Sequence, residues 1–160
     1  MYYEEVFKAL EENKVRYLVV GGVALVLHGV VRLTGDLDLM IDLETANVEL
    51  FLKTMTLIGY KPKLPVKAAE FADPQKRASW IAEKAMKVFP FIHEKDDYKI
   101  IDVFPENPIP FSKAYGDRQK ITAGKLNISV ISFDDLIALK TMAGREQDKK
   151  DVEMLRELKK

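Results

Sequence analysis

Cysteine is absent from the 160 residues of this chain, and histidine occurs twice. Without thiols the chain forms neither a disulfide bridge nor a metal centre with thiolate ligands, and this composition fits a reducing compartment. Two histidines are too few for a histidine-rich metal site. The sequence also shows no arrangement of serine, histidine and aspartate that would indicate nucleophilic catalysis by a serine.

The chain has no surplus of charge of either sign, because Lys+Arg and Asp+Glu both total 25. Balanced charge argues against a long nucleic-acid-binding surface, although it leaves contact with a tRNA end open. The longest apolar run, residues 18–31, is interrupted by glycines and by His28 and is too short to span a bilayer. The charged, amphipathic start of the chain is unlike a secretory signal. We therefore expect a cytoplasmic protein without a membrane partner.

The length fits one domain with a core of its own. Apolar periodicity and capping signals predict helices at 2–13, 22–29, 44–58, 74–86, 133–143 and 147–158. Alternating and β-branched stretches predict strands at 15–20, 36–42, 87–93, 98–104, 117–122 and 126–132, with loops at 61–65 and 105–110.

The order of these elements begins with a βαβ-like unit and continues with hairpins. It predicts an α+β fold, in which a small mixed sheet carries helices packed on one face and a C-terminal helical pair follows. We expect one domain over residues 1–160, with a core at 1–132 and the helical pair at 133–160.

Residues 18–42 contain two features that point to a site for phosphate chemistry. Gly21 and Gly22 follow an apolar strand and open a helix, so a phosphate could approach bare backbone N–H groups there. Asp36 and Asp38 are spaced to lie on the same face of the next strand. Neighbouring carboxylates repel each other unless one takes up a proton or a cation lies between them. A phosphate cradle beside such a pair indicates phosphoryl or nucleotidyl transfer.

A third carboxylate, that of Asp102, interrupts an apolar strand in which aspartate is disfavoured. Its neighbours Ile101 and Val103 should face the core, which places Asp102 on the opposite face. Asp36, Asp38 and Asp102 together could hold one or two Mg²⁺ ions through their oxygens, with Mn²⁺ as an alternative. In a two-metal arrangement, one ion lowers the pKa of the attacking hydroxyl and the other stabilises the leaving pyrophosphate.

The ordered set Val20-Gly21-Gly22, Asp36-Leu37-Asp38 and Asp102 resembles the nucleotidyltransferases of the polymerase-β type. The segment Arg32 to Asp38 and the tail Lys140 to Asp151 are most similar to the minimal nucleotidyltransferases related to the AbiEii-type abortive-infection toxins. The resemblance covers most of the chain, with residues 114–127 the least matched.

The resemblance implies that the three aspartates bind the metal ions and that Asp102 also serves as a general base. It implies phosphate binding by a second set of residues, namely Gly21, Gly22, Arg32, Thr34, Lys140 and Arg145. The implied substrate is an NTP such as ATP, and the acceptor is a hydroxyl of a tRNA end, a protein or a small molecule. Many relatives carry serine where this chain has Gly22, so the backbone must hold the phosphate without that hydroxyl.

Structural interpretations of the same residues stay open. Asp36 can cap the turn at 34–35, Asp38 can be a solvated residue of an edge strand, and Asp102 can belong to a surface ion pair. Arg32 can be an ordinary ion-pair residue of the loop, and Lys140 can lie on a solvated helix edge. The spacing of Arg145, Asp148 and Asp151 slightly favours a set of charges that stabilises a helix. His28 and His93 suit structural positions, and Trp80, Phe89 and Phe91 suit the core.

Two further functions remain as alternatives to turnover. A nucleotide-binding or partner-binding module could keep the fold and lose catalysis, and the glycine at position 22 motivates this hypothesis. A component of a toxin–antitoxin pair, bound to a partner protein, is a weaker idea. The sequence leaves the preferred base and the oligomeric state open.

Overall fold

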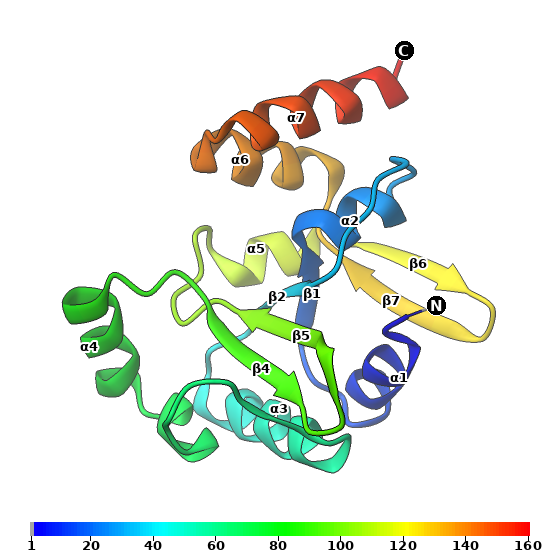
Figure 1. The fold of residues 1–160 in the computed structure, drawn as a ribbon. Helices are drawn as coiled ribbons and strands as arrows, with labels where there is room; N and C mark the ends of the chain where they lie inside the picture. The colour runs from blue at the N-terminus through cyan, green and yellow to red at the C-terminus, as the bar shows by residue number, and fades with distance from the viewer. Residues whose placement is uncertain (1) are drawn as a thin grey trace.

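The computed structural model describes residues 2–160, which form a sheet flanked by helices (Figure 1). The helices are α1 (Glu4–Glu12), α2 (Gly21–Leu27), α3 (Thr45–Leu57), the 3-10 helix η1 (Ala68–Ala72), α4 (Pro74–Lys84), α5 (Phe111–Gly116), α6 (Phe133–Ala143) and α7 (Glu146–Leu158). The strands are β1 (Tyr17–Val20), β2 (Leu37–Ile41), β3 (Tyr60–Pro62), β4 (Phe89–His93), β5 (Asp96–Val103), β6 (Gln119–Ala123) and β7 (Leu126–Val130).

Within residues 2–160 the strands form one seven-stranded mixed sheet in the order β3-β4-β5-β2-β1-β7-β6. Strand β2 pairs in parallel with β5, and β1 pairs in parallel with β7, while the remaining pairs are antiparallel. The α+β prediction with a small mixed sheet is therefore confirmed. The βαβ-like start is wrong in one respect, because β1 and β2 run antiparallel. The connection through α2 returns the chain beside β1 in the opposite direction.

One face of the sheet is covered by aromatic side chains from the helices. Phe51 of α3 lies edge-on to Phe91 of β4, and Phe71 of η1 contacts Phe89 in the same strand. Trp80 of α4 stacks on Phe89, with ring centres 5.2 Å apart. Fully burying a side chain of this size contributes about 1.5–3 kcal/mol. The prediction that Trp80, Phe89 and Phe91 fill the core is confirmed.

The capping interactions expected from the sequence are present at the ends of α4 and α6. The carboxylate of Asp73 accepts a hydrogen bond from the Gln75 N–H at the start of α4, and the Ser132 hydroxyl accepts one from the Asp135 N–H at the start of α6. Gly144 ends α6 with a φ of 64°, a left-handed conformation that glycine adopts without strain.

Three elements escaped the sequence analysis: β3, η1 and α5. Residues 61–65 were expected to form a connector because they contain two prolines, yet residues 60–62 pair with β4. The strand lies at the edge of the sheet, where proline is tolerated since one side needs no hydrogen-bond donor. The other two are short helices without a full period of apolar residues, so periodicity could not reveal them.

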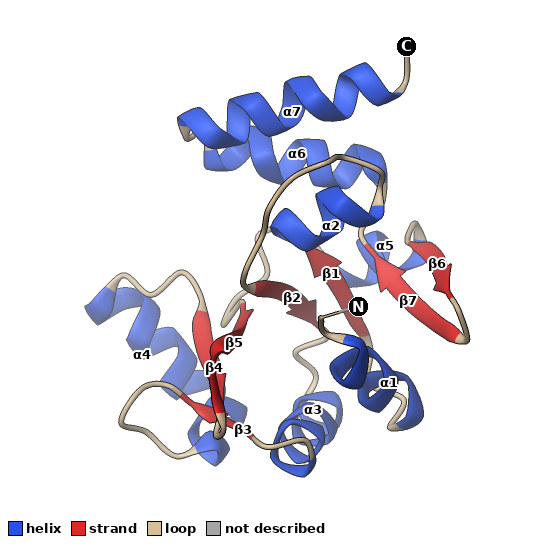
Figure 2. Cartoon of the chain, turned by 45° about the vertical axis from the view of Figure 1, so that its right-hand side comes forward, coloured by secondary structure: helices blue, strands red, loops and turns tan. Residues whose placement is uncertain are grey.

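The predicted C-terminal pair consists of α6 and α7, which pack against each other, and α6 also contacts α2. Figure 2 shows this pair beyond α2, on the side of the molecule away from α3. Among residues 2–160, no helix is long and apolar enough to cross a membrane.

Candidate active site

Asp38 and Asp102 lie side by side in the centre of the sheet. They are register partners of the parallel strands β2 and β5, so both side chains leave the same face. The residues on either side of Asp102, Ile101 and Val103, are fully buried on the opposite face. Adjacent strands are about 4.8 Å apart, which brings the two carboxylates into each other's electrostatic range.

Asp36 lies one residue before β2 and is exposed, whereas Asp38 and Asp102 are half-buried. Its carboxyl is close enough to Asp102 for a hydrogen bond between the two groups. The structure thus brings together the three aspartates that the sequence analysis selected. This face of the sheet is partly open at the three aspartates, since none of them is fully buried.

Burial and mutual repulsion shift the acidity of this group. Desolvation, then the charges of Asp102 and Asp36, raise the pKa of Asp38 to about 7, although Lys140 and Arg145 oppose the rise. Desolvation, then the charge and hydrogen bond of Asp36, raise the pKa of Asp102 to about 6. Close carboxylates with raised pKa values are typical of sites for catalysis or cation binding.

The donor set fits a hard divalent cation, because it consists of carboxylate oxygens whose repulsion a cation would relieve. As they stand, however, no three His, Asp or Glu side chains within residues 2–160 are arranged to hold a metal ion. The three aspartates therefore suit Mg²⁺ by chemistry and neighbourhood, and their side chains would have to rotate to share one ion.

Gly21 and Gly22 bring the backbone at the start of α2 directly against this group. Gly21 has a φ of 67°, and a Cβ built on it would overlap the Asp38 carboxylate. A Cβ built on Gly22 would overlap the hydroxyl of Thr34. The Thr34 hydroxyl therefore fills the space beside Gly22 in which a larger residue would place its side chain.

The predicted phosphate-binding cations are paired with carboxylates of α7. Lys140 is buried between Asp151, with Nζ to Oδ2 at 2.9 Å, and Asp148, at 3.3 Å. Arg32 also binds Asp151, with NH1 to Oδ2 at 2.6 Å. Arg145 binds Asp148 through Nε at 2.7 Å. The ion-pair interpretation of Arg32 and Arg145 therefore describes contacts that the structure contains. The solvated-edge interpretation of Lys140 is wrong, because its side chain is buried between two carboxylates of α7.

The pKa values of the two α7 carboxylates reflect these pairs. Burial would raise the pKa of Asp148 and Asp151, but hydrogen bonds and charges from the cations outweigh it and lower both. Arg145 keeps a side chain that is 75% exposed, whereas that of Lys140 is 10% exposed. Of the two, Arg145 is the cation that can reach a ligand without leaving a buried charge unpaired.

Two residues near the aspartates escaped the sequence analysis. The Tyr3 hydroxyl donates a hydrogen bond to the carbonyl of Gly35 and lies 3.2 Å from that of Ile100, so it links the backbone just before Asp36 to β5. Lys63, exposed after β3, lowers the pKa of Asp102 through its charge. No sequence signal indicated that either residue lies near the aspartates, because both reach them through contacts with residues that are distant along the chain.

The raised pKa values predict a stability that falls as the pH rises. Because the pKa of Asp38 is higher in the folded chain than the ordinary value of 3.8, the folded chain binds more protons between about pH 4 and pH 7. The free energy of unfolding should therefore decrease over that range, and Asp102 should add to the decrease up to about pH 6. Urea unfolding of the wild type and of Asp38→Asn would measure it. A wild-type slope that Asp38→Asn leaves unchanged would contradict the assignment.

Comparisons with known proteins agree with this geometry. A family model described as "Nucleotidyltransferase of unknown function (DUF6036)" matches residues 3–157. No curated protein matches the chain.

Solved structures share the fold at low sequence identity. The lincosamide antibiotic adenylyltransferase LnuA, with lincomycin bound, is 19% identical with a TM-score of 0.61, over 96% of this chain and 95% of that one. ANT(2'')-Ia in complex with adenylyl-2''-tobramycin is 13% identical with a TM-score of 0.61, over 96% and 85%. An antigenic nucleotidyltransferase-like protein from Paracoccidioides brasiliensis is 13% identical with a TM-score of 0.59, over 96% and 72%.

Proposed function

This chain belongs to the DUF6036 family of nucleotidyltransferases, and from that premise we propose that it transfers a nucleoside monophosphate from an NTP to a hydroxyl acceptor and releases pyrophosphate. The prediction of a nucleotidyltransferase is confirmed at the level of the family. The observation that best supports this proposal is that Asp38 lies opposite Asp102 on parallel strands, with Asp36 beside them. The turn at Gly21 lies directly against Asp38.

In this proposal, Asp36, Asp38 and Asp102 hold Mg²⁺, or Mn²⁺ in its place, which supplies positive charge to the triphosphate. Asp102 is also proposed to accept the proton of the acceptor hydroxyl, the general-base role that the resemblance implies for it. ATP is the first nucleotide to test, and the AbiEii kinship remains a prediction.

The phosphates are proposed to lie against Gly21 and Gly22, with the Thr34 hydroxyl beside them. Arg145 contributes a charged fork from the start of α7, and Lys63 a charge from the other side of the aspartates. Lys140 and Arg32 act mainly by fixing Asp151 and so the position of α7 beside the site.

The acceptor is proposed to be the hydroxyl of a small molecule. LnuA was solved with lincomycin, and ANT(2'')-Ia with an adenylylated tobramycin. These two proteins resemble the chain along 96% of its length, which makes lincosamides and aminoglycosides the first acceptors to test. A tRNA end and a protein hydroxyl are the other acceptors in the same experiment.

Transfer can be tested with each labelled NTP, with Mg²⁺ or EDTA, and with the acceptors named above. We expect labelled acceptor and pyrophosphate with Mg²⁺ and neither with EDTA. Thermal unfolding provides a second measurement, because Mg²⁺ should raise the melting temperature at about pH 8 more than at about pH 5, where Asp38 and Asp102 bind protons. Tight NTP binding without Mg²⁺ and without pyrophosphate would favour the binding module instead. Dependence on a partner protein would favour the toxin–antitoxin alternative.

The contact between Gly22 and Thr34 predicts a reciprocal effect of two substitutions. Gly22→Ser alone should lower the melting temperature and nucleotide binding, because the new Cβ overlaps the Thr34 hydroxyl. Adding Thr34→Gly opens that space and lets the serine hydroxyl take its place, so the double variant should recover. The coupling free energy should be about 1–2 kcal/mol.

Thermal unfolding and calorimetry with an NTP measure this coupling. Gly35→Ser is the matched control, since a Cβ there meets nothing within 4 Å. Additive effects of Gly22→Ser and Thr34→Gly would show that the two residues do not share this space.

A further inference from the structure

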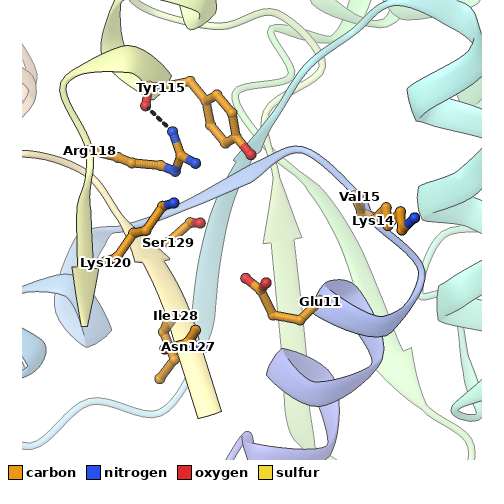
Figure 3. A pocket seen from close by; sticks show the side chains of 9 residues that line it. All are labelled: Glu11, Lys14, Val15, Tyr115, Arg118, Lys120, Asn127, Ile128 and Ser129. Carbon is orange, nitrogen blue, oxygen red and sulfur yellow. Dashed lines mark hydrogen bonds between the residues drawn. The ribbon is translucent and has the colours of Figure 1, made fainter. Parts of the chain in front are cut away.

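A pocket separate from the aspartates lies between the end of α1, α5 and the β6–β7 hairpin (Figure 3). Its volume of about 400 Å³ is within the range of small-molecule sites. Val15 lines it just before β1, whereas Val20 at the other end of β1 pairs with Asp38. Five residues of extended chain span roughly 17 Å, so the pocket is outside the reach of the proposed transfer chemistry.

The pocket is lined by three cationic side chains and one carboxylate. In Figure 3, Arg118 and Lys120 lie across the pocket from the Glu11 carboxylate, whereas the Lys14 amine, beside Val15, points away from them. None of the three cations forms an ion pair in the part of the chain that the structure describes, residues 2–160. Glu11 accepts a hydrogen bond from the Tyr17 hydroxyl at 3.0 Å. The pocket therefore has a surplus of positive charge that the described residues leave uncompensated.

Arg118 is held in place but incompletely hydrogen-bonded. Its guanidinium lies 3.8 Å from the centre of the Tyr115 ring, and its NH1 donates to the Tyr115 carbonyl at 2.8 Å. Its Nε is buried and has no hydrogen-bond partner among the described residues. A buried donor without a partner costs about 1–3 kcal/mol, and an anion that entered beside the guanidinium would offset that cost.

Ser129 adds a second polar group to the pocket. The residue is 6% exposed, its side chain is hydrogen-bonded to Tyr17, and its N–H donates to the Tyr17 hydroxyl at 3.2 Å. Figure 3 shows the hydroxyl directed into the pocket, near the amine of Lys120. The hydroxyl has one rotatable O–H, so it could turn from Tyr17 to donate to a phosphate oxygen that entered among the cations.

We propose that this pocket binds a phosphate-bearing small molecule, with its phosphate held by Arg118, Lys120 and Ser129 and with a ligand hydroxyl donating to Glu11. Lys14, in the turn after α1, adds positive charge at the rim of the pocket. Arginine suits this role because its planar fork donates two parallel hydrogen bonds to phosphate oxygens. The size of the pocket fits a sugar phosphate, whose hydroxyls match the remaining carboxylate.

The test uses the full chain and two-dimensional NMR titration with ribose 5-phosphate, inorganic phosphate and ribose. Ribose 5-phosphate should shift the backbone signals of Lys120 and Ser129, and it should bind at least about tenfold more tightly than ribose. Arg118→Gln should weaken binding about tenfold or more, whereas Lys125→Gln, an exposed lysine of the same hairpin, should leave it unchanged. If Arg118→Gln fails to fold, Lys14→Gln combined with Lys120→Gln tests the same claim.

Inorganic phosphate that binds as tightly as ribose 5-phosphate would assign the pocket to free phosphate and overturn the small-molecule ligand. A short single-stranded RNA that binds more tightly through the same residues would overturn it as well. If Arg118→Gln and Lys125→Gln bound ribose 5-phosphate equally well, the pocket would not be a phosphate-binding site. Nucleotidyl transfer in Arg118→Gln should match the wild type, so failure of this proposal can be distinguished from failure of the transferase proposal.

Discussion

Asp38→Asn should reduce nucleotidyl transfer about 10³-fold while the chain remains folded. Asparagine keeps the shape of the side chain but removes the charge that faces Asp102 across the parallel strands. Loss of one carboxylate from a repelling group should also stabilise the fold at about pH 8, because the pKa of Asp38 is raised to about 7. A rate assay with labelled NTP and urea unfolding measure both effects.

Asp97→Asn is the matched control for this substitution. Asp97 is exposed on β5, the strand that carries Asp102, and has no place in the site. Its substitution should change neither transfer nor stability by much. If Asp38→Asn transferred nucleotides at the rate of Asp97→Asn, the aspartates would not form the catalytic group, and the nucleotide-binding module would be the better explanation of the fold.

Gly21→Ala should destabilise the chain by about 3 kcal/mol and abolish transfer. About 1 kcal/mol comes from placing alanine at a positive φ, and about 2 kcal/mol from overlap of its Cβ with the Asp38 carboxylate. The overlap forces either the start of α2 or the catalytic side chain to move, and both changes disturb the proposed phosphate cradle. Chemical unfolding and the labelled-NTP assay report the two losses.

Gly124→Ala separates backbone strain from overlap. Gly124 has a φ of 63°, close to the 67° of Gly21, but a Cβ built on it meets nothing within 4 Å. Gly124→Ala should therefore cost about 1 kcal/mol and leave transfer intact. Equal destabilisation by Gly21→Ala and Gly124→Ala would mean that Gly21 is needed for its backbone conformation alone. The space beside Asp38 would then contribute nothing to stability.

The substitution Asp38→Asn also changes the surroundings of Lys140 and Arg145. Lys140 and Arg145 lower the pKa of Asp38, so part of their role is electrostatic even though they are paired with Asp148 and Asp151. In Asp38→Asn this interaction disappears, while the ion pairs with α7 remain. The position of α7 should therefore survive the substitution, and the loss of transfer can be assigned to the aspartate itself.

Residue type and local spacing were sufficient for much of the fold. The caps at Asp73, Ser132 and Gly144 were predictable because a cap depends on hydrogen bonds within a few residues. The alternation of Ile101, Asp102 and Val103 was predictable because side chains on a strand point to opposite faces in turn. The short elements were not predictable, since β3 forms by pairing with β4 and α5 is too short to have a period of its own.

By itself, the sequence determined which side chains could do chemistry and which face of a strand each would occupy. The tertiary structure decided which of them meet: Asp38 opposite Asp102, the Thr34 hydroxyl against Gly22, and Tyr3 between Gly35 and Ile100. It also decided that Arg32 pairs with Asp151, 119 residues further along the chain. The physical reason is that periodicity and capping depend on neighbours in sequence, whereas strand register and ion-pair partners depend on how the whole sheet and its helices pack.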